Sequence, residues 1–343
     1  MADGMEGEAV ASLDGLTTLQ YARTPALDAL RGCGAVRLLH TTPVGMKPGS
    51  EVAIVSLLGY DARRVAQSRA PFEAAGAGYV PKSGELLMRC NLVEIGDDGM
   101  ISPPLSHDEP RQAIERLNRE CTDRRVRFIE GQGSHHLLAI EGGSADIICT
   151  PAHEALGRPA SDCLARAAGV ASSTYTALTP METAMLVNKL ALTHHVWPWS
   201  PGFPPEMKPL GIDGAVITAV NLVRGIARYA GLEIIEVPGA TGEPDTNYSG
   251  KAMAALQGIA DHDFVMLHIE GSDTASHARD IGAKIRAIEM IDRLVIAPIV
   301  SSLREAPYRV ELTVTADHPT SVLTGLHLPH PVTAVIACLG LKS

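Results

Sequence analysis

The sequence predicts an α/β protein in which a doubly wound, mostly parallel sheet is interrupted by a smaller α+β domain. In the second half of the chain, continuous apolar runs alternate with helical patterns, which is typical of strands buried on both faces of a parallel sheet. The middle of the chain instead has short strands separated by polar turns. Aromatic residues make up only 4%, whereas Gly (32) and Pro (23) are plentiful. This composition favours layers packed by small aliphatic side chains with tight connections.

The core sheet is predicted from four apolar runs: Leu232–Val237, Phe264–Ile269, Val310–Val314 and Val332–Leu339. Two helices are predicted over Ile212–Tyr229 and Ile281–Val295, because apolar residues recur on one face of each. Strands that alternate with helices in this way form right-handed crossovers, and these build a doubly wound sheet.

The inserted domain is predicted from three short strand patterns and one helix. The strands cover Glu85–Ile95, Arg125–Ile129 and His136–Glu141, and the helix covers Glu109–Cys121. Segments rich in Gly, Ala and Ser near residues 76–79 and 167–173 mark the boundaries. We therefore expect a core of residues 1–76 and 172–343, and an inserted domain of residues 77–171.

Composition disfavours several classes of protein. Asp and Glu outnumber Lys and Arg by 39 to 29, which gives a net charge of −10 and argues against a nucleic-acid partner. No apolar run approaches the roughly 20 residues that cross a bilayer, so no membrane partner is expected. The N-terminus has no basic leader before an apolar run. The six cysteines form no CxxC pair, which suits reduced thiols. The expected location is the cytoplasm.

Carboxylate and imidazole side chains gather after two of the predicted core strands. Asp273 and His277 follow the run Phe264–Ile269, while Asp317 and His318 follow Val310–Val314, with His327 nine residues beyond His318. Ligands bind at the carboxyl ends of strands in such sheets. Carboxylate with imidazole is a ligand set for divalent ions, although each pair alone is also typical of a polar surface.

Ser50 follows Pro48-Gly49 and precedes the apolar segment Val52–Leu58, a pattern that predicts a helix start. In isolation, Ser50 is best interpreted as an N-cap. A helix N-terminus also attracts phosphate, and a metal-coordinated hydroxyl is a strong nucleophile toward phosphorus. Asp3, near the start of the chain, is a further ligand candidate, although a terminal carboxylate is usually solvated.

These residues belong to longer motifs that run nearly end to end: Asp3–Met5, Ala22–Asp28, Pro48–Ala53, Leu57–Asp61, Arg69–Gly76, Arg89–Asn91, Val237–Gly242, Asp245–Thr246, Asp273–His277 and Thr315–Thr320. In combination they resemble the cofactor-independent (2,3-bisphosphoglycerate-independent) phosphoglycerate mutases of the archaeal and bacterial type, within the alkaline phosphatase superfamily. The resemblance implies an alkaline-phosphatase-like core that carries an inserted substrate-binding cap.

The resemblance also implies an isomerase of glycolysis that uses two divalent metal ions, with Mn²⁺ favoured and Mg²⁺, Zn²⁺ or Co²⁺ as alternatives. One ion would be held by Asp273, His277 and His327, and the other by Asp3, Ser50, Asp317 and His318. Ser50 would accept the phosphoryl group of 3-phosphoglycerate and return it to the 2-hydroxyl. The substrate is a small phosphorylated carboxylic acid, and the residues implied to bind it are Arg69, Arg89 and His135. No oligomeric state is implied.

Four departures from the family pattern bear on this expectation. Only Met1 and Ala2 precede Asp3, so the first core strand of the family is expected to be missing. The chain also stops soon after the run Val332–Leu339, where relatives carry a further segment. The family's Trp-Gly-x-Gly reads Trp199-Ser200-Pro201-Gly202, and its Tyr-Arg-His-Leu-Leu has His135 in place of arginine. Two alternatives stay open: a phosphohydrolase or mutase for another small phosphate or phosphonate acid, and a catalytically degenerate member.

Overall fold

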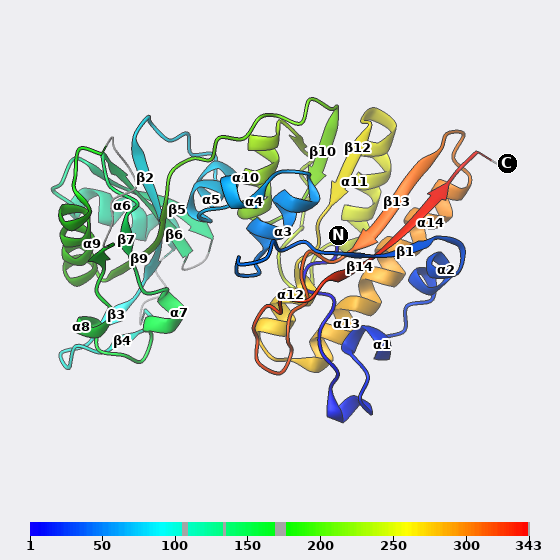
Figure 1. The fold of residues 1–343 in the computed structure, drawn as a ribbon, viewed down its shortest axis with the longest axis horizontal. Helices are drawn as coiled ribbons and strands as arrows, with labels where there is room; N and C mark the ends of the chain where they lie inside the picture. The colour runs from blue at the N-terminus through cyan, green and yellow to red at the C-terminus, as the bar shows by residue number, and fades with distance from the viewer. Residues whose placement is uncertain (105–108, 133–134, 169–175, 342–343) are drawn as a thin grey trace. The chain divides into compact units, whose positions relative to one another are not determined.

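The computed structural model describes residues 1–104, 109–132, 135–168 and 176–341, and the chain divides into two compact units (Figure 1). The first unit comprises Met1–Ala66 and Met207–Ser343, and the second comprises Gln67–Glu206. The second unit extends beyond the expected boundaries of 77–171, because it also contains α5 (Ala70–Gly76), α9 (Pro180–His194) and β9 (Val196–Gly202). Strand β9 pairs with the central strand of that unit, and Leu186, Val187 and Leu190 of α9 belong to its core.

The first unit contains a three-stranded parallel sheet in the order β11-β10-β12. Its strands are β10 (Gly214–Ile217), β11 (Glu233–Ile234) and β12 (Phe264–Leu267), and its connecting helices are α10 (Asn221–Ala230) and α11 (Tyr248–Asp261) (Figure 1). The prediction of one helix over residues 212–229 is wrong in its first half, where the fully buried run Gly214–Ile217 is a strand. A buried strand of four apolar residues has no period that separates it from a helix.

A second sheet of the first unit is antiparallel, in the order β1-β14-β13. Its strands are β1 (Ala35–Leu39), β13 (Val310–Thr315) and β14 (Val332–Leu339). The expectation of a mostly parallel sheet is therefore wrong for this second sheet of the first unit. The chain turns back after β13 through residues 316–331, so β14 runs alongside β13 in the opposite direction.

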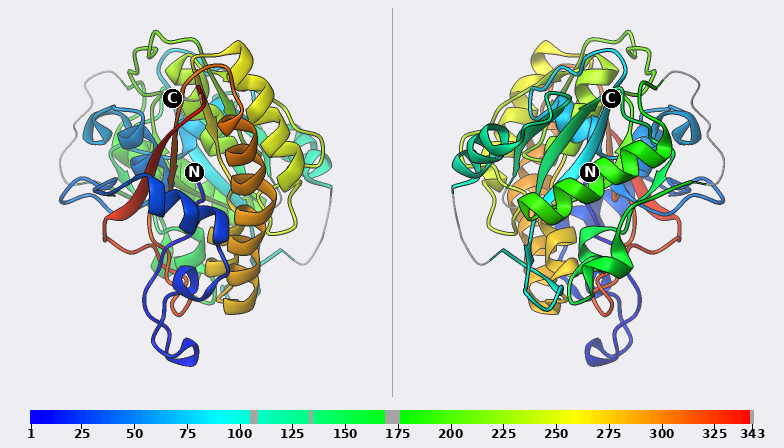
Figure 2. Two further views of the ribbon diagram at one scale, coloured as in Figure 1. Left: turned by 90° about the vertical axis from the view of Figure 1, so that its right-hand side faces the viewer. Right: turned by 90° about the vertical axis from the view of Figure 1, so that its left-hand side faces the viewer.

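Helices pack beside these two sheets. Helix α13 (Ile281–Ile291) continues through a π-helical turn (Asp292–Ile296) into α14 (Ala297–Arg304), and together they form one long rod (Figure 2, left). The predicted helix over 281–295 is thus confirmed and extended. The remaining helices of this unit are the 3-10 turn Ala11–Leu13, α1 (Thr18–Tyr21), α2 (Pro25–Cys33), α3 (Ser50–Leu57), α4 (Ala62–Val65) and α12 (Gly271–His277).

The first three residues lie between β12 and β13. The Ala2 N–H donates to the Thr315 carbonyl (2.9 Å), and the Asp3 N–H donates to the Ile269 carbonyl (2.8 Å). Ala2 forms a single parallel bridge with Ile269. These backbone hydrogen bonds nevertheless fix Asp3 at the carboxyl ends of both strands.

The second unit is α+β, and the predicted strand and helix patterns of the middle region are confirmed. Its main sheet is antiparallel in the order β5-β6-β2-β9, built from β2 (Glu85–Leu92), β5 (Val126–Gln132), β6 (His135–Glu141) and β9. Helices α6 (Pro110–Glu120) and α9 contribute to its core. The short elements are β3 (Glu94–Ile95), β4 (Ile101–Ser102), β7 (Ile147–Ile148), α7 (Ala152–Ala155), α8 (Ala160–Cys163) and β8 (Arg166–Ala167).

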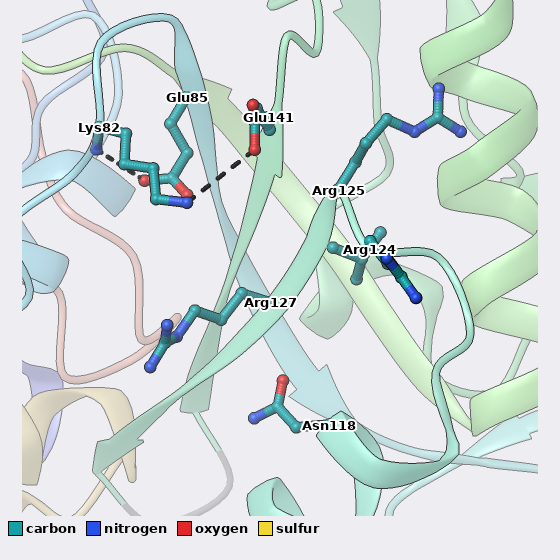
Figure 3. Close-up of a pocket in the computed structure, with 8 residues that line it drawn as sticks. Lys82, Glu85, Asn118, Arg124, Arg125, Arg127 and Glu141 are labelled. Atoms are coloured by element: carbon teal, nitrogen blue, oxygen red, sulfur yellow. Dashed lines mark hydrogen bonds and ion pairs between the residues drawn. The ribbon is translucent and has the colours of Figure 1, made fainter.

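A polar pocket of about 330 Å³ lies on the second unit, and its lining mixes cationic and acidic side chains (Figure 3). The Lys82 side chain forms an ion pair with Glu141 (3.9 Å), and the Lys82 backbone N–H donates to the Glu85 carboxylate (2.9 Å). None of the residues expected to bind substrate lines this pocket. Within the described residues, no helix combines the length and apolar character that a membrane crossing requires.

Candidate functional site

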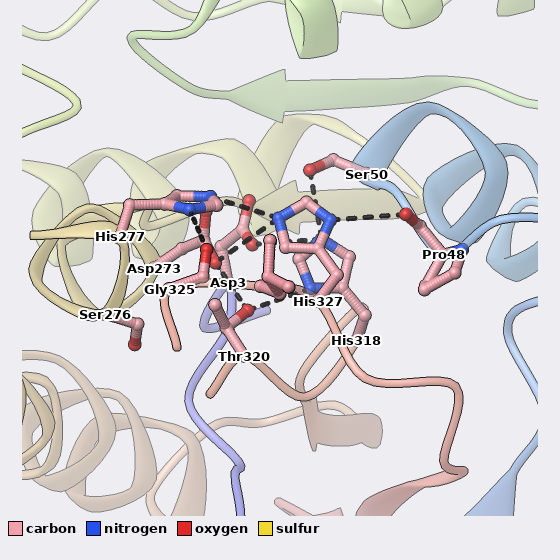
Figure 4. Close-up of polar contacts among 12 residues, drawn as sticks. Asp3, Pro48, Ser50, Asp273, Ser276, His277, His318, Thr320, Gly325 and His327 are labelled. Atoms are coloured by element: carbon pink, nitrogen blue, oxygen red, sulfur yellow. Dashed lines mark hydrogen bonds and ion pairs between the residues drawn. The ribbon is translucent and has the colours of Figure 1, made fainter. Parts of the chain in front are cut away.

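Ser50 is the first residue of α3, and Gly49 occupies the N-cap position without a side-chain capping bond. The predicted helix start is therefore confirmed, and Ser50 lies next to the N-cap position rather than in it. Its side chain is buried, and its Oγ lies 3.2 Å from Nε2 of His318 (Figure 4). The start of α3 thus directs a hydroxyl toward the loop that follows β13.

Asp273, His277 and His327 converge on one point. Asp273 and His277 lie one turn apart on α12, with His277 Nε2 3.0 Å from the Asp273 carboxylate. His327 Nε2 lies 3.1 Å from His277 Nε2 and 3.8 Å from Asp273. A backbone bridge between Thr320 and His327 folds the loop after β13 back on itself, which places His327 beside α12.

The hydrogen bonds of each Nδ1 fix the tautomers of these two histidines. Nδ1 of His277 faces the Gly325 carbonyl (2.8 Å), and Nδ1 of His327 faces the Pro48 carbonyl (3.3 Å). A carbonyl only accepts, so each neutral ring carries its hydrogen on Nδ1 and presents an Nε2 lone pair. Two lone pairs and a carboxylate therefore face one another, an arrangement that a bound cation would satisfy.

Asp3, Asp317 and His318 form a second convergence beside Ser50. His318 Nε2 lies 3.2 Å from Asp317 and 3.8 Å from Asp3. The Thr320 hydroxyl donates to Asp273 (2.6 Å), so it accepts from His318 Nδ1 (3.2 Å), and Nε2 of His318 is again a lone pair. Among the described residues, one buried oxygen of Asp3 and one of Asp317 have no hydrogen-bond partner. Buried carboxylate oxygens without hydrogen-bond partners, next to an imidazole lone pair, are a suitable set of ligands for a divalent ion.

Burial and neighbouring charges shift the pKa values of this cluster. Burial, with the adjacent Asp317 charge, raises the pKa of Asp3, and burial lowers that of His318. Burial also opposes ionisation of Asp273, but the neighbouring His277 and His327 hold its pKa well below the usual range. The Asp273 partner raises the pKa of His277. A bound cation would favour the ionised form of Asp3 and the neutral form of the imidazoles, which are the states that ligate metal.

Gly4 lies against this cluster and cannot be replaced by a larger residue without movement. Its φ is +58°, and a Cβ there would overlap the Asp273 carboxylate. The Gly4 N–H donates to Asp317 (3.2 Å). The absence of a side chain therefore lets the N-terminal segment approach both acidic ligands at once.

His268 and Lys284 also belong to the site, although sequence reasoning missed them. His268 Nε2 lies 3.0 Å from Asp3, and its Nδ1 lies 3.1 Å from the Thr218 hydroxyl. Burial lowers its pKa to about 3. Buried Lys284 donates to the carbonyls of Glu6 (3.0 Å) and Thr320 (2.7 Å), which joins the segments that carry Asp3 and His318. Two features of the sequence could have identified them. His268 is a histidine within the apolar run that precedes Asp273, and Lys284 is a lysine on the apolar face of a predicted helix.

In the part of the chain that the structure describes, three groups have ligand atoms within 4.8 Å of one another: Asp273 with His318 and His327, Asp3 with Asp317 and His318, and Asp3 with His268 and Glu270. All of these residues lie in the first unit. Every residue expected to hold metal is therefore at or next to a cluster that can hold a cation, and Ser50 adjoins it.

The residues expected to bind substrate lie in the second unit. Arg69 and Arg89 both form ion pairs with Glu73, at 3.4 and 3.0 Å. His135 begins β6, is exposed and pairs across the sheet with Asn91, two residues from Arg89. The second unit thus brings the two arginines to one carboxylate and places His135 on the neighbouring strand.

Comparison with known proteins identifies the family. A family model for 2,3-bisphosphoglycerate-independent phosphoglycerate mutase matches residues 32–194. The chain is 36% identical to 2,3-bisphosphoglycerate-independent phosphoglycerate mutase 2 of Methanothermobacter thermautotrophicus, over 98% of this chain and 87% of the relative. The chain belongs to this mutase family. A probable mutase of the same name from Geobacter sulfurreducens is 35% identical, over 98% of this chain and 89% of the relative.

Solved structures support the same conclusion for the fold of this mutase-family chain. The PH0037 protein from Pyrococcus horikoshii matches with a TM-score of 0.75 and 25% identity, over 100% of this chain and 87% of that chain. The cofactor-independent phosphoglycerate mutase from Thermoplasma acidophilum matches with a TM-score of 0.58 at 20% identity, over 98% of this chain and 88% of that chain. The phosphoglycerate mutases are isomerases, and this chain is a member of that enzyme class.

Proposed function

We propose that this chain interconverts 3-phosphoglycerate and 2-phosphoglycerate through a phosphoserine at Ser50. The observation that carries the proposal is the position of the Ser50 hydroxyl, 3.2 Å from His318 Nε2 at the edge of a buried carboxylate–imidazole cluster. Membership of the mutase family supports the same substrate. An alkaline-phosphatase-like core and a cytoplasmic location are part of the proposal.

Two divalent metal ions fit the clustered residues. Asp273, His277 and His327 would hold one ion, and Asp3, Ser50, Asp317 and His318 would hold the other. Carboxylate and imidazole ligands without thiolates suit Mn²⁺, which we favour, and also Mg²⁺, Zn²⁺ or Co²⁺. When bound, such ions lower the pKa of a coordinated hydroxyl and offset charge on a transferred phosphoryl group.

In the forward direction, Ser50 Oγ attacks the phosphorus of 3-phosphoglycerate. Ser50 gives up its hydroxyl proton as the Oγ–P bond forms and the bond between phosphorus and the 3-oxygen breaks, and the 3-oxygen takes up a proton. The 2-hydroxyl of the resulting glycerate then gives up its proton and attacks the phosphoserine. The bond between Oγ and phosphorus breaks, Ser50 Oγ takes up a proton, and 2-phosphoglycerate is formed. Burial of Ser50 excludes water, which would otherwise hydrolyse the phosphoserine.

The second unit would bind the substrate's anionic groups. Arg69 and Arg89 present guanidinium groups, which pair with carboxylate and phosphate in a bidentate manner. His135 would contribute a weaker, pH-dependent contact where relatives have arginine. The presence of histidine instead of arginine favours a second candidate function. In it, the protein is a phosphohydrolase or a mutase for another small phosphate or phosphonate acid.

Incubation of the purified protein with Mn²⁺ and 3-phosphoglycerate tests the proposal. We expect 2-phosphoglycerate as the product, and we expect Ser50→Ala to abolish its formation while metal stays bound, because the Asp and His ligands remain. Release of free phosphate would favour the second candidate instead. Substantial mutase activity in the Ser50→Ala variant would show that another group is the nucleophile.

A further inference from the structure

One carboxylate in the second unit joins the two arginines proposed to bind substrate. Glu73 lies one helical turn after Arg69, and its Oε1 is 3.4 Å from Nε of Arg69. Its other oxygen, Oε2, is 3.0 Å from Nε of Arg89, which comes from strand β2. Glu73 and Arg89 are mostly buried, with 14% of each side chain exposed. Each carboxylate oxygen of Glu73 therefore forms an ion pair with a different guanidinium group.

The guanidinium group of Arg89 also contacts an aromatic ring. Its guanidinium carbon lies 4.5 Å from the centre of the Trp199 ring, within the range of a cation–π interaction. Trp199 faces Arg89 because β9 pairs with β2 in the register Arg89–Trp199. The Trp199 indole N–H in turn donates to the side-chain oxygen of Asn91 (2.8 Å). Arg89 is thus held by two contacts, one with a carboxylate and one with an aromatic ring.

Two guanidinium groups that share one neighbourhood repel each other, and more strongly when partly buried than in water. A carboxylate between them removes that repulsion and leaves the group of three with one net positive charge. It also restricts two long side chains that would otherwise lose rotamer freedom when the substrate binds. Arginines prepared in this way bind an anion at a lower entropic cost.

We propose that Glu73 is a positioning residue of the substrate site, which holds Arg69 and Arg89 side by side for a ligand with two anionic groups. The inference rests on the proposed function, because it takes 3-phosphoglycerate as that ligand. Glu73 acts through the arginines and does not contact the substrate itself.

The sign of the effect on binding separates this role from a simple charge effect. Glu73 is itself negative, so its removal makes the surroundings more positive and, on charge alone, strengthens binding of an anionic substrate. Loss of arginine positioning acts in the opposite direction. The inference requires that the loss of positioning outweighs the gain in charge.

The test measures binding of 3-phosphoglycerate to the Mn²⁺-loaded full chain by calorimetry, together with steady-state kinetics. Glu73→Gln keeps the size of the side chain and removes its charge. We expect Kd and KM to rise by about tenfold while kcat changes by less than about threefold. Glu73→Asp keeps the charge, so its Kd should fall between those of the wild type and the Gln variant.

The matched control is Glu115→Gln, which breaks an exposed ion pair of the same i,i+4 spacing between Arg111 and Glu115 on α6. Its Kd and KM should equal those of the wild type. Thermal unfolding of all variants shows whether a change in binding reflects a loss of folded protein.

A Kd for Glu73→Gln that is unchanged or lower than that of the wild type would overturn the inference. The binding measurement does not depend on turnover, so a wild type that binds 3-phosphoglycerate without making 2-phosphoglycerate would refute the proposed function alone. A wild type that does not bind 3-phosphoglycerate would refute both.

Discussion

At the scale of single residues, the groups that contact Nδ1 of the site's histidines determine which ring nitrogen can bind a metal ion. The Nδ1 atoms of His277 and His327 face carbonyls, and that of His318 faces a hydroxyl that already donates to Asp273. All three rings therefore direct Nε2 lone pairs inward. The sequence predicted these residue types as ligands, because they follow strand ends. It did not reveal the tautomers, which depend on the loop after β13 folding back on itself.

Replacement of His277 by alanine should lower the metal content of the purified protein. We expect a loss of about one ion per chain at limiting Mn²⁺, because the substitution removes one of the three ligands proposed for that ion. Elemental analysis after dialysis measures the change. His330→Ala is the control, since His330 is exposed on the same loop, and it should retain the wild-type content. An unchanged metal content in His277→Ala would contradict the assignment.

Buried His136 should make the protein sensitive to acid. Burial, with the neighbouring His135, lowers its pKa to about 4 from the usual 6.5. Between pH 6.5 and 4, the unfolded chain binds a proton that the folded chain does not, so the unfolding free energy falls as the pH falls. The loss from this group approaches about 3 kcal/mol near pH 4.

Denaturant unfolding at pH 7 and at pH 4.5 tests this prediction. The loss of stability between the two pH values should be smaller for His136→Gln than for the wild type, because glutamine does not titrate. His153→Gln, which alters an exposed histidine, should show the wild-type loss. Equal losses in all three proteins would show that His136 does not carry the effect.

At the scale of elements, isolated apolar runs were predictable as strands, whereas a short strand close to a helix was not. Strand β14 has the bounds expected from its apolar run, and α13 begins at the expected residue. Strand β10 was instead assigned to a helix, because Gly214–Ile217 directly precedes a true amphipathic helix and its apolar residues continue that pattern. The strand is defined by pairing with β11 and β12, which are distant in sequence.

The capping box of α9 should contribute measurably to stability. The Thr179 hydroxyl accepts from the Glu182 N–H (3.2 Å), while the Glu182 side chain accepts from the Thr179 N–H (2.8 Å). Thr179→Ala should lower the unfolding free energy by about 1 kcal/mol, because a donor at the helix start loses its partner. Chemical denaturation measures the change. Thr193→Ala, near the other end of α9, should cost much less, and equal losses would contradict the capping role.

At the scale of the whole molecule, the features that could not be predicted from the sequence depend on pairing between strands that are far apart in the chain. The alternation of strands and helices indicated the α/β class, but not that β13 and β14 would be antiparallel. The second unit extends to Glu206 because β9 pairs with β2 more than a hundred residues earlier in the chain. No local composition marks that pairing. The Gly- and Ala-rich segment near residues 76–79 marks a local turn, and the segment near residues 167–173 lies mostly outside the described residues.

The site itself is assembled from the two ends of the chain. The Gly4 N–H donates to Asp317, across 313 positions of sequence. The motifs near residues 273 and 318 were predicted to converge because both follow strand ends, and the family resemblance added the motifs near residues 3 and 50. The supporting contacts of His268, Thr320 and Lys284 were not predicted, since they depend on how separate loops pack.

The central claim is that Ser50 carries the phosphoryl group during turnover. The most direct measurement is acid quenching of the Mn²⁺-loaded enzyme within its first turnovers with 3-phosphoglycerate, followed by mass analysis of its peptides. We predict a phosphoryl group on Ser50 that appears before 2-phosphoglycerate accumulates and disappears as the substrate is exhausted. Formation of 2-phosphoglycerate with no phosphorylated Ser50 at any time would contradict the claim.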